Sequence, residues 1–95
     1  MAAPKLVLHS TAGYRPELDR LVADWMKRGV RYIGVYGVDA SRVEDIIDEL
    51  CVGDGSEPYF MLTASHPPGE GRADALALAL QISEEHGSGV EEVEF

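Results

Sequence analysis

The sequence contains a single cysteine, Cys51, and no apolar run near the 18 residues that a membrane-spanning helix needs. One thiol excludes an internal disulfide and favours a reducing compartment. The first residues pass directly into the strand-like stretch Leu6-Val7-Leu8, without the apolar core of a signal peptide. We therefore expect a cytoplasmic protein that does not enter a membrane.

Positive charge is scarce as well. The chain has 8 lysines and arginines against 17 aspartates and glutamates, a formal net charge of −9. Nucleic acids and anionic membranes are bound through clustered cations, so the composition excludes both as partners. A charge of this sign promotes solubility and permits association with a basic protein.

The fingerprints of common catalytic and cofactor sites are missing. The stretch from His9 to Pro16 has neither glycine-rich phosphate-loop pattern, and Ser65 lacks the flanking glycines of a nucleophile elbow. His9, His66 and Asp39 do not stand at a metal-site spacing, so we predict no metal and no cofactor. A short Gly69-x-Gly71-Arg72 pattern is an alternative place for an anion before a helix.

Three helices are predicted from apolar periodicity. The first, Pro16 to Arg28, has a one-sided apolar stripe and a stop at Gly29. The second begins with the capping-box pattern Ser41-x-x-Glu44 and stops near Gly53. The third, roughly Arg72 to His86, is apolar over more than half of its circumference, which indicates an extra neighbour.

Four strands alternate with these helices, at Lys5–His9, Arg31–Val38, Tyr59–Ala64 and Gly89–Phe95. The first three are apolar on both faces, as in covered parallel strands. The third of them ends in the polar run Ser65-His66 before two prolines. The last strand carries three glutamates and reads as an edge strand.

This alternation predicts one α/β domain over residues 1–95, with a four-stranded, mainly parallel sheet between two helix layers. We favour strand order 2-1-3-4, and 3-2-1-4 stays open. The architecture resembles a fragment of a flavodoxin-like fold. It also resembles a shortened response-regulator receiver, but His9-Ser10 and Thr63-Ala64 stand where receivers have acidic residues, so no receiver role is transferred.

A site in such a sheet lies at the carboxyl ends of the strands. If strands one and three are neighbours, His9, Ser10, Ser65 and His66 converge there. The expected ligand cleft comprises five residues: Ser10, Thr11, Asp39, Ser65 and His66. The catalytic candidates are His66, Ser65 and His9, which supply the groups of a small hydrolase or transferase.

Order 2-1-3-4 would leave the third strand partly uncovered on the face that holds one helix, and a second copy of the chain would cover it. We therefore expect a non-catalytic, homodimeric binding or interaction module, with the hydrolase or transferase as an alternative. Seven acidic residues lie from Asp39 to Glu57 against one Arg42. In size and charge the chain resembles small acidic inhibitors of basic enzymes, which implies a basic protein partner as a third reading.

Overall fold

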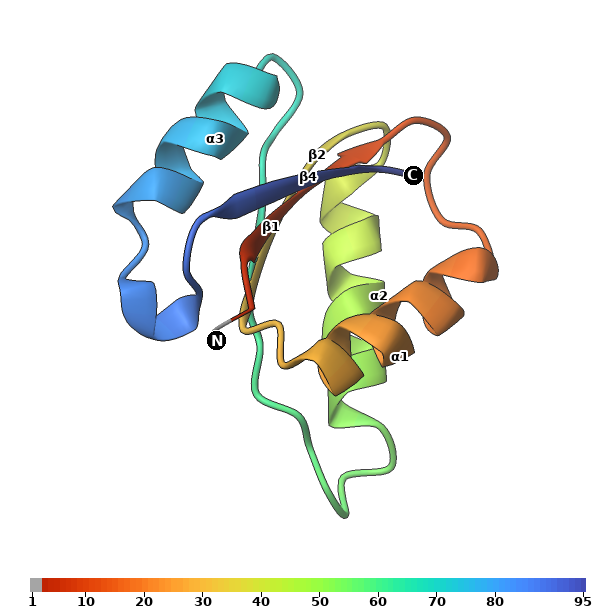
Figure 1. Cartoon of the computed structure of the whole chain (residues 1–95). Coiled ribbons are helices and arrows are strands. Elements are labelled where there is room, and N and C mark those ends of the chain that lie inside the picture. Colours follow the sequence, from red (N-terminus) through yellow and green to blue (C-terminus); the bar gives the residue numbers. More distant parts are fainter. Residues whose placement is uncertain (1–2) are drawn as a thin grey trace.

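The computed structural model describes residues 3–95, which form one parallel sheet with helices on both faces. The strands are β1 (Lys5–Ser10), β2 (Tyr32–Gly37), β3 (Leu62–Ser65) and β4 (Val90–Glu94). All three strand pairings are parallel. The predicted α/β class and its three layers are confirmed (Figure 1).

The strand order is β3-β2-β1-β4, so the favoured order 2-1-3-4 is wrong and the open alternative 3-2-1-4 is correct. The reason lies in the first two helices. Both helices bury their apolar stripes in one shared core, so both lie on the same face of the sheet. The strands that they connect therefore follow one another in one direction, from β1 to β2 to β3. The third helix then crosses the other face and delivers β4 beside β1.

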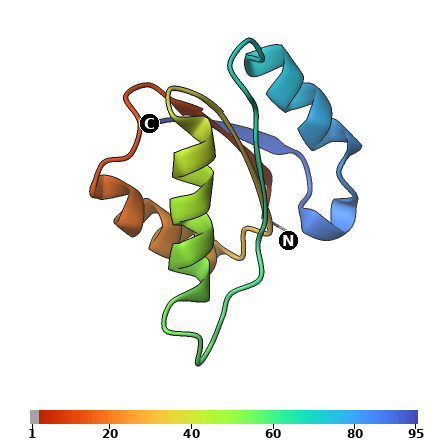
Figure 2. The ribbon, with the colours of Figure 1, turned by 180° about the vertical axis from the view of Figure 1, so that it is seen from behind.

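The two helix layers are unequal. The helices α1 (Glu17–Arg28) and α2 (Ala40–Val52) cover one face of the sheet, and α3 (Arg72–Gln81) covers the other (Figures 1 and 2). The predicted first helix is confirmed, with Gly29 ending it at a φ of 81°. The predicted third helix is shorter than expected, because Ile82 is extended and Glu84–His86 form a separate 3-10 turn, η1.

The larger core lies between the sheet and the α1–α2 layer. It gathers buried side chains of β1, β2, α1 and α2, among them Leu6, Leu8, Leu18, Trp25, Ile33 and Ile47. Cys51 is buried there, and burial raises the pKa of its thiol, with nearby Asp48 adding to the effect.

The smaller core lies under α3 and consists of Val7, Tyr32, Ala75 and Ala79. Small alanines let this helix approach the sheet closely. The buried Lys5 adds a polar contact: its ammonium donates hydrogen bonds to the carbonyl oxygens of Ala79, at 3.0 Å, and Ile82. A cation therefore holds the negative end of the α3 dipole against β1.

Strand β3 is not the fully buried strand that its sequence indicates. It is an edge strand, with Leu62 38% exposed and Thr63, Ala64 and Ser65 half-buried. Just before it, Phe60 is 80% exposed. Phe60 and Leu62 of this stretch therefore lie at the surface, whereas Met61 is buried and Tyr59 packs against the larger core. Within residues 3–95, no helix has both the length and the apolarity to cross a membrane.

Candidate functional site

The carboxyl ends of β2 and β3 open into a hollow of about 520 Å³, a volume in the range of small-molecule sites. We call it the α2 hollow, because the first residues of α2 form one of its walls. Its lining residues are Gly37, Asp39, Ala40, Ser41, Ser65, His66, Pro67 and Pro68. Three of the five predicted ligand residues, Asp39, Ser65 and His66, are therefore brought together.

A tight bend between β2 and α2 forms part of the wall of the α2 hollow. Gly37 has a φ of 106°, and an added Cβ would collide with the carbonyl oxygen of Ser10, so only glycine fits. Asp39 follows with a φ of 55°, in the left-handed region that few side chains adopt. Its Oδ2 lies beside Gly13, 3.6 Å from where a Cβ on that glycine would stand. The Asp39 carboxylate is therefore turned toward the β1–α1 loop.

The amino-terminal end of α2 is uncapped. The predicted capping box does not form, because the helix begins at Ala40, and Asp39 makes no side-chain cap. The carboxylate expected to cap, Glu44, instead accepts a hydrogen bond of 2.9 Å from the Thr63 hydroxyl, which also contacts Asp48 at 2.9 Å. No group within residues 3–95 accepts a hydrogen bond from the N–H of Ala40, Ser41 or Arg42.

His66 is the most buried titratable side chain of the α2 hollow, at 6% exposure. Its Nδ1 lies 2.8 Å from the Oε1 of Glu70, four residues further along the chain. Its Nε2 is buried and has no hydrogen-bond partner among the residues that the structure describes. The carboxylate of Glu70 thus fixes one ring nitrogen and leaves the other unused. The Ser65 hydroxyl forms no hydrogen bond with this ring within residues 3–95.

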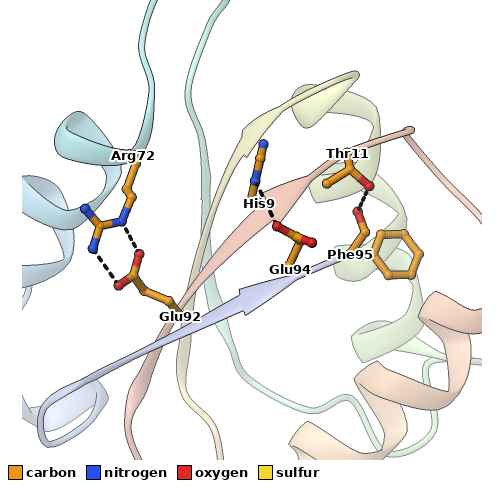
Figure 3. A network of polar contacts seen from close by, with 6 residues as sticks. All are labelled: His9, Thr11, Arg72, Glu92, Glu94 and Phe95. Carbon is orange, nitrogen blue, oxygen red and sulfur yellow. Dashed lines mark hydrogen bonds and ion pairs between the residues drawn. The ribbon is translucent and has the colours of Figure 1, made fainter.

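His9, the remaining catalytic candidate, lies in a different place. It lines a second hollow on the α3 face, with Tyr36, Arg72 and residues of β4. Its ring stacks on Tyr36 with the centroids 4.7 Å apart. Its Nδ1 is 3.9 Å from Glu94 Oε2, a contact that Figure 3 shows. Strand β2 separates β1 from β3, so His9 and His66 do not converge, contrary to the expectation from order 2-1-3-4.

The alternative anion place at Gly69, Gly71 and Arg72 is occupied by carboxylates of the chain itself. The Gly71 N–H donates to Asp74 Oδ2 at 2.9 Å. The Arg72 guanidinium donates to both oxygens of Glu92, at 2.6 and 2.9 Å (Figure 3). This pairing lowers the pKa of Glu92 and raises that of Arg72, chiefly through the hydrogen bonds. Neither the cation nor that N–H is free for a ligand.

The point where strand order reverses lies between β1 and β4, and the chain itself fills it. Phe95 is buried there, 5% exposed, and its carbonyl oxygen accepts hydrogen bonds of 2.7 Å from the Thr11 hydroxyl and backbone N–H (Figure 3). The buried Ser10 hydroxyl accepts the Gly13 N–H at 3.2 Å. Ser10 and Thr11 therefore support the β1–α1 loop and do not line the α2 hollow.

Among residues 3–95 there is no group of three histidine, cysteine, aspartate or glutamate side chains placed to hold an ion. The residue that sequence reasoning missed is Glu70, four positions after His66. A histidine and a carboxylate four residues apart are a signal that the sequence contains. Two prolines lie between them, and prolines gave no indication that the chain turns so as to bring the two side chains together.

The fold places the chain in the class of small three-layer α/β proteins with a parallel sheet. Comparison with known proteins adds no closer assignment: no family model, no curated protein and no solved structure matches the chain significantly.

Proposed function

We propose that this chain is a cytoplasmic, non-catalytic interaction module whose contact surface is the free edge of β3. The observation that carries the proposal is the chemistry of that edge. The stretch from Tyr59 to Ser65 contains no charged residue, and it exposes Phe60 and Leu62. Exposed apolar edge strands without charge are templates for pairing with another chain. The opposite edge, β4, carries Glu91, Glu92 and Glu94, which oppose such pairing.

The backbone of β3 presents its hydrogen-bonding groups outward at alternate residues. The N–H groups of Leu62 and His66 donate inward to β2, to the carbonyls of Arg31 and Val35, at 2.9 Å each. Because a strand alternates with a period of two, the N–H and C=O groups of Met61, Thr63 and Ser65 point away from the sheet. These groups are available to a strand from another molecule.

The occupant that we favour is a second copy of the chain. Two β3 edges related by a two-fold axis pair in antiparallel fashion, since each offers the same groups to the other. The pairing covers Phe60 and Leu62 of both copies. It also brings the Glu44 and Asp48 carboxylates of the two α2 helices toward one axis, since both contact Thr63 of β3.

A second occupant is supported by those same carboxylates. An extended basic segment of another protein would pair with the β3 backbone and place its cations beside Glu44 and Asp48. The two occupants respond to salt in opposite directions. Screening weakens the repulsion between two copies but also weakens the attraction of a basic segment.

Sedimentation equilibrium at about 20 mM and about 500 mM NaCl tests the proposal, because the Debye length falls severalfold over this range. We expect a monomer–dimer equilibrium that tightens with salt. Leu62→Lys, which adds a charge at the edge, should leave a monomer. Leu80→Lys is the matched control, since Leu80 is 74% exposed on α3, away from β3.

A wild-type chain that stays monomeric at high protein concentration in both salts would exclude the dimer. A lysine-rich peptide that binds the wild type at low salt, but not the Leu62→Lys variant, would then support the basic segment. If neither self-association nor peptide binding depends on Leu62, the β3 edge is not the contact surface.

A further inference from the structure

We propose that the α2 hollow binds a phosphate group, either free phosphate or the headgroup of a small phosphomonoester. This site is separate from the β3 edge surface, and the inference does not rest on the proposed interaction function. It rests on two features that meet in one hollow: unpaired backbone donors at the amino-terminal end of α2 and an unpartnered buried imidazole.

The backbone donors come from the first turn of α2. The N–H groups of Ala40, Ser41 and Arg42 have no acceptor within residues 3–95, and Ala40 and Ser41 line the hollow. Helix N-termini of this kind bind oxyanions because several N–H groups converge and the helix dipole is positive there.

One acidic side chain, that of Asp39, stands at this helix end, and it makes no cap hydrogen bond. The first turn of α2 contains no acidic residue and instead carries the exposed cation of Arg42. The Glu44 carboxylate, which the capping-box pattern assigned to this end, accepts a hydrogen bond from Thr63 instead. The hollow therefore offers unpaired backbone N–H donors at a helix end, with Asp39 as the one acidic residue among its lining residues.

The imidazole of His66 supplies the second, independent indication of a ligand. An unpaired polar atom is costly to bury, so an unpartnered buried Nε2 points to a group that binds there. His66 lines the hollow, whereas Glu70, which holds Nδ1, does not.

A phosphate group satisfies Nε2 in either state of the ring. When both nitrogens are protonated, Nε2–H donates to a phosphate oxygen, and the Glu70 carboxylate balances the charge. When only Nδ1 is protonated, Nε2 accepts the P–O–H of a monoprotonated phosphate. Sulfate has no such proton at neutral pH, so it is the weaker ligand.

The test is a titration of the full chain with inorganic phosphate, followed by backbone and histidine-ring NMR. We expect phosphate to shift the amide signals of Ala40 to Arg42 and the ring signals of His66. Ser41→Glu fills the helix end with a carboxylate of its own, and His66→Gln removes the ring. Each should weaken binding by at least about tenfold.

The controls carry the same changes away from the hollow. Ser88→Glu and His86→Gln should bind phosphate like the wild type. Because Ser41 is exposed and a carboxylate there favours the helix, loss of binding in Ser41→Glu cannot result from unfolding. Asp39→Asn, which removes the one carboxylate among the lining residues of the hollow, should strengthen binding.

The binding of phenyl phosphate and of sulfate is then compared with that of inorganic phosphate, to decide between free phosphate and a phosphomonoester as the ligand. Tighter binding of phenyl phosphate than of inorganic phosphate identifies a phosphomonoester site, and equal binding identifies free phosphate. The proposal is overturned if phosphate shifts no signal of Ala40 to Arg42. It is also overturned if Ser41→Glu and His66→Gln bind phosphate as well as their controls do.

Discussion

Tyr32 is the clearest case in which a single side chain departs from what its sequence position indicates. It is fully buried beneath α3, and its hydroxyl has no hydrogen-bond partner within residues 3–95. Burial raises its pKa, with a smaller contribution from Glu44. The ring folds back over Gly34, where an added Cβ would lie 2.9 Å from the Tyr32 Oη. The glycine therefore makes room for the Tyr32 ring.

Two tyrosine-to-phenylalanine changes separate burial from hydrogen bonding. Tyr59→Phe removes a hydroxyl that donates to the Val30 carbonyl, and we expect a loss of about 1 kcal/mol in the free energy of unfolding. Tyr32→Phe removes a hydroxyl that has no partner, so stability should stay unchanged or rise by up to about 1 kcal/mol. Urea denaturation of the two variants checks this, and an equal loss in both would contradict it.

At the scale of elements, α3 shows that apolar periodicity can predict a helix without predicting which of its faces is buried. Its apolar residues surround most of the helix, so the sequence did not identify the buried face. The structure chooses the face of Ala75 and Ala79 and leaves Leu80 74% exposed, because only small side chains permit close contact with the sheet. The contact is completed by Lys5, a residue far away in the sequence.

Lys5→Met tests this attachment of α3. The change keeps an apolar side chain of similar length but removes the donor to the Ala79 and Ile82 carbonyls. We expect a loss of about 2 kcal/mol in the free energy of unfolding, since a charged donor is lost from a buried place. Amide exchange should become faster in α3 before it does in α2.

Lys27→Met is the matched control for Lys5→Met, because Lys27 is an exposed lysine in the last turn of α1. Its effect should be limited to a small helix-dipole contribution. If the two variants lose the same stability, Lys5 does not hold α3 in place.

At the scale of the whole molecule, acidic charge is concentrated on the α2 side. Asp45, Asp48 and Glu49 are exposed along this helix, and none of them forms an ion pair within residues 3–95. Charge of one sign destabilises a compact chain through self-repulsion, and salt screens it. The folded chain should therefore become more stable as ionic strength rises.

The double variant Asp45→Asn/Glu49→Gln tests this expectation in the Leu62→Lys background, which excludes self-association from the measurement. Its melting temperature should exceed that of the background at about 20 mM NaCl, and the difference should vanish at about 500 mM, where repulsion is screened. A difference that persists at high salt would show that local helix effects, not repulsion, are responsible.

The sequence by itself determined the element types, the parallel sheet and the polar residues at the strand ends. Apolar periodicity, Gly29 and the strand–helix alternation are local signals, and local chemistry is enough to read them. It also placed Asp39, Ser65 and His66 at one end of the molecule, because parallel strands all end on the same edge.

Only the tertiary structure decided the strand order, and with it which surfaces are exposed and which side chains lie together. Packing of α1 and α2 into a single core placed β2 between β1 and β3, which separated His9 from His66 and turned an apparently buried strand into an exposed edge. It also drew Glu44 to Thr63 and left the amino-terminal end of α2 uncapped. These outcomes depend on contacts between distant segments, which no local pattern in the chain encodes.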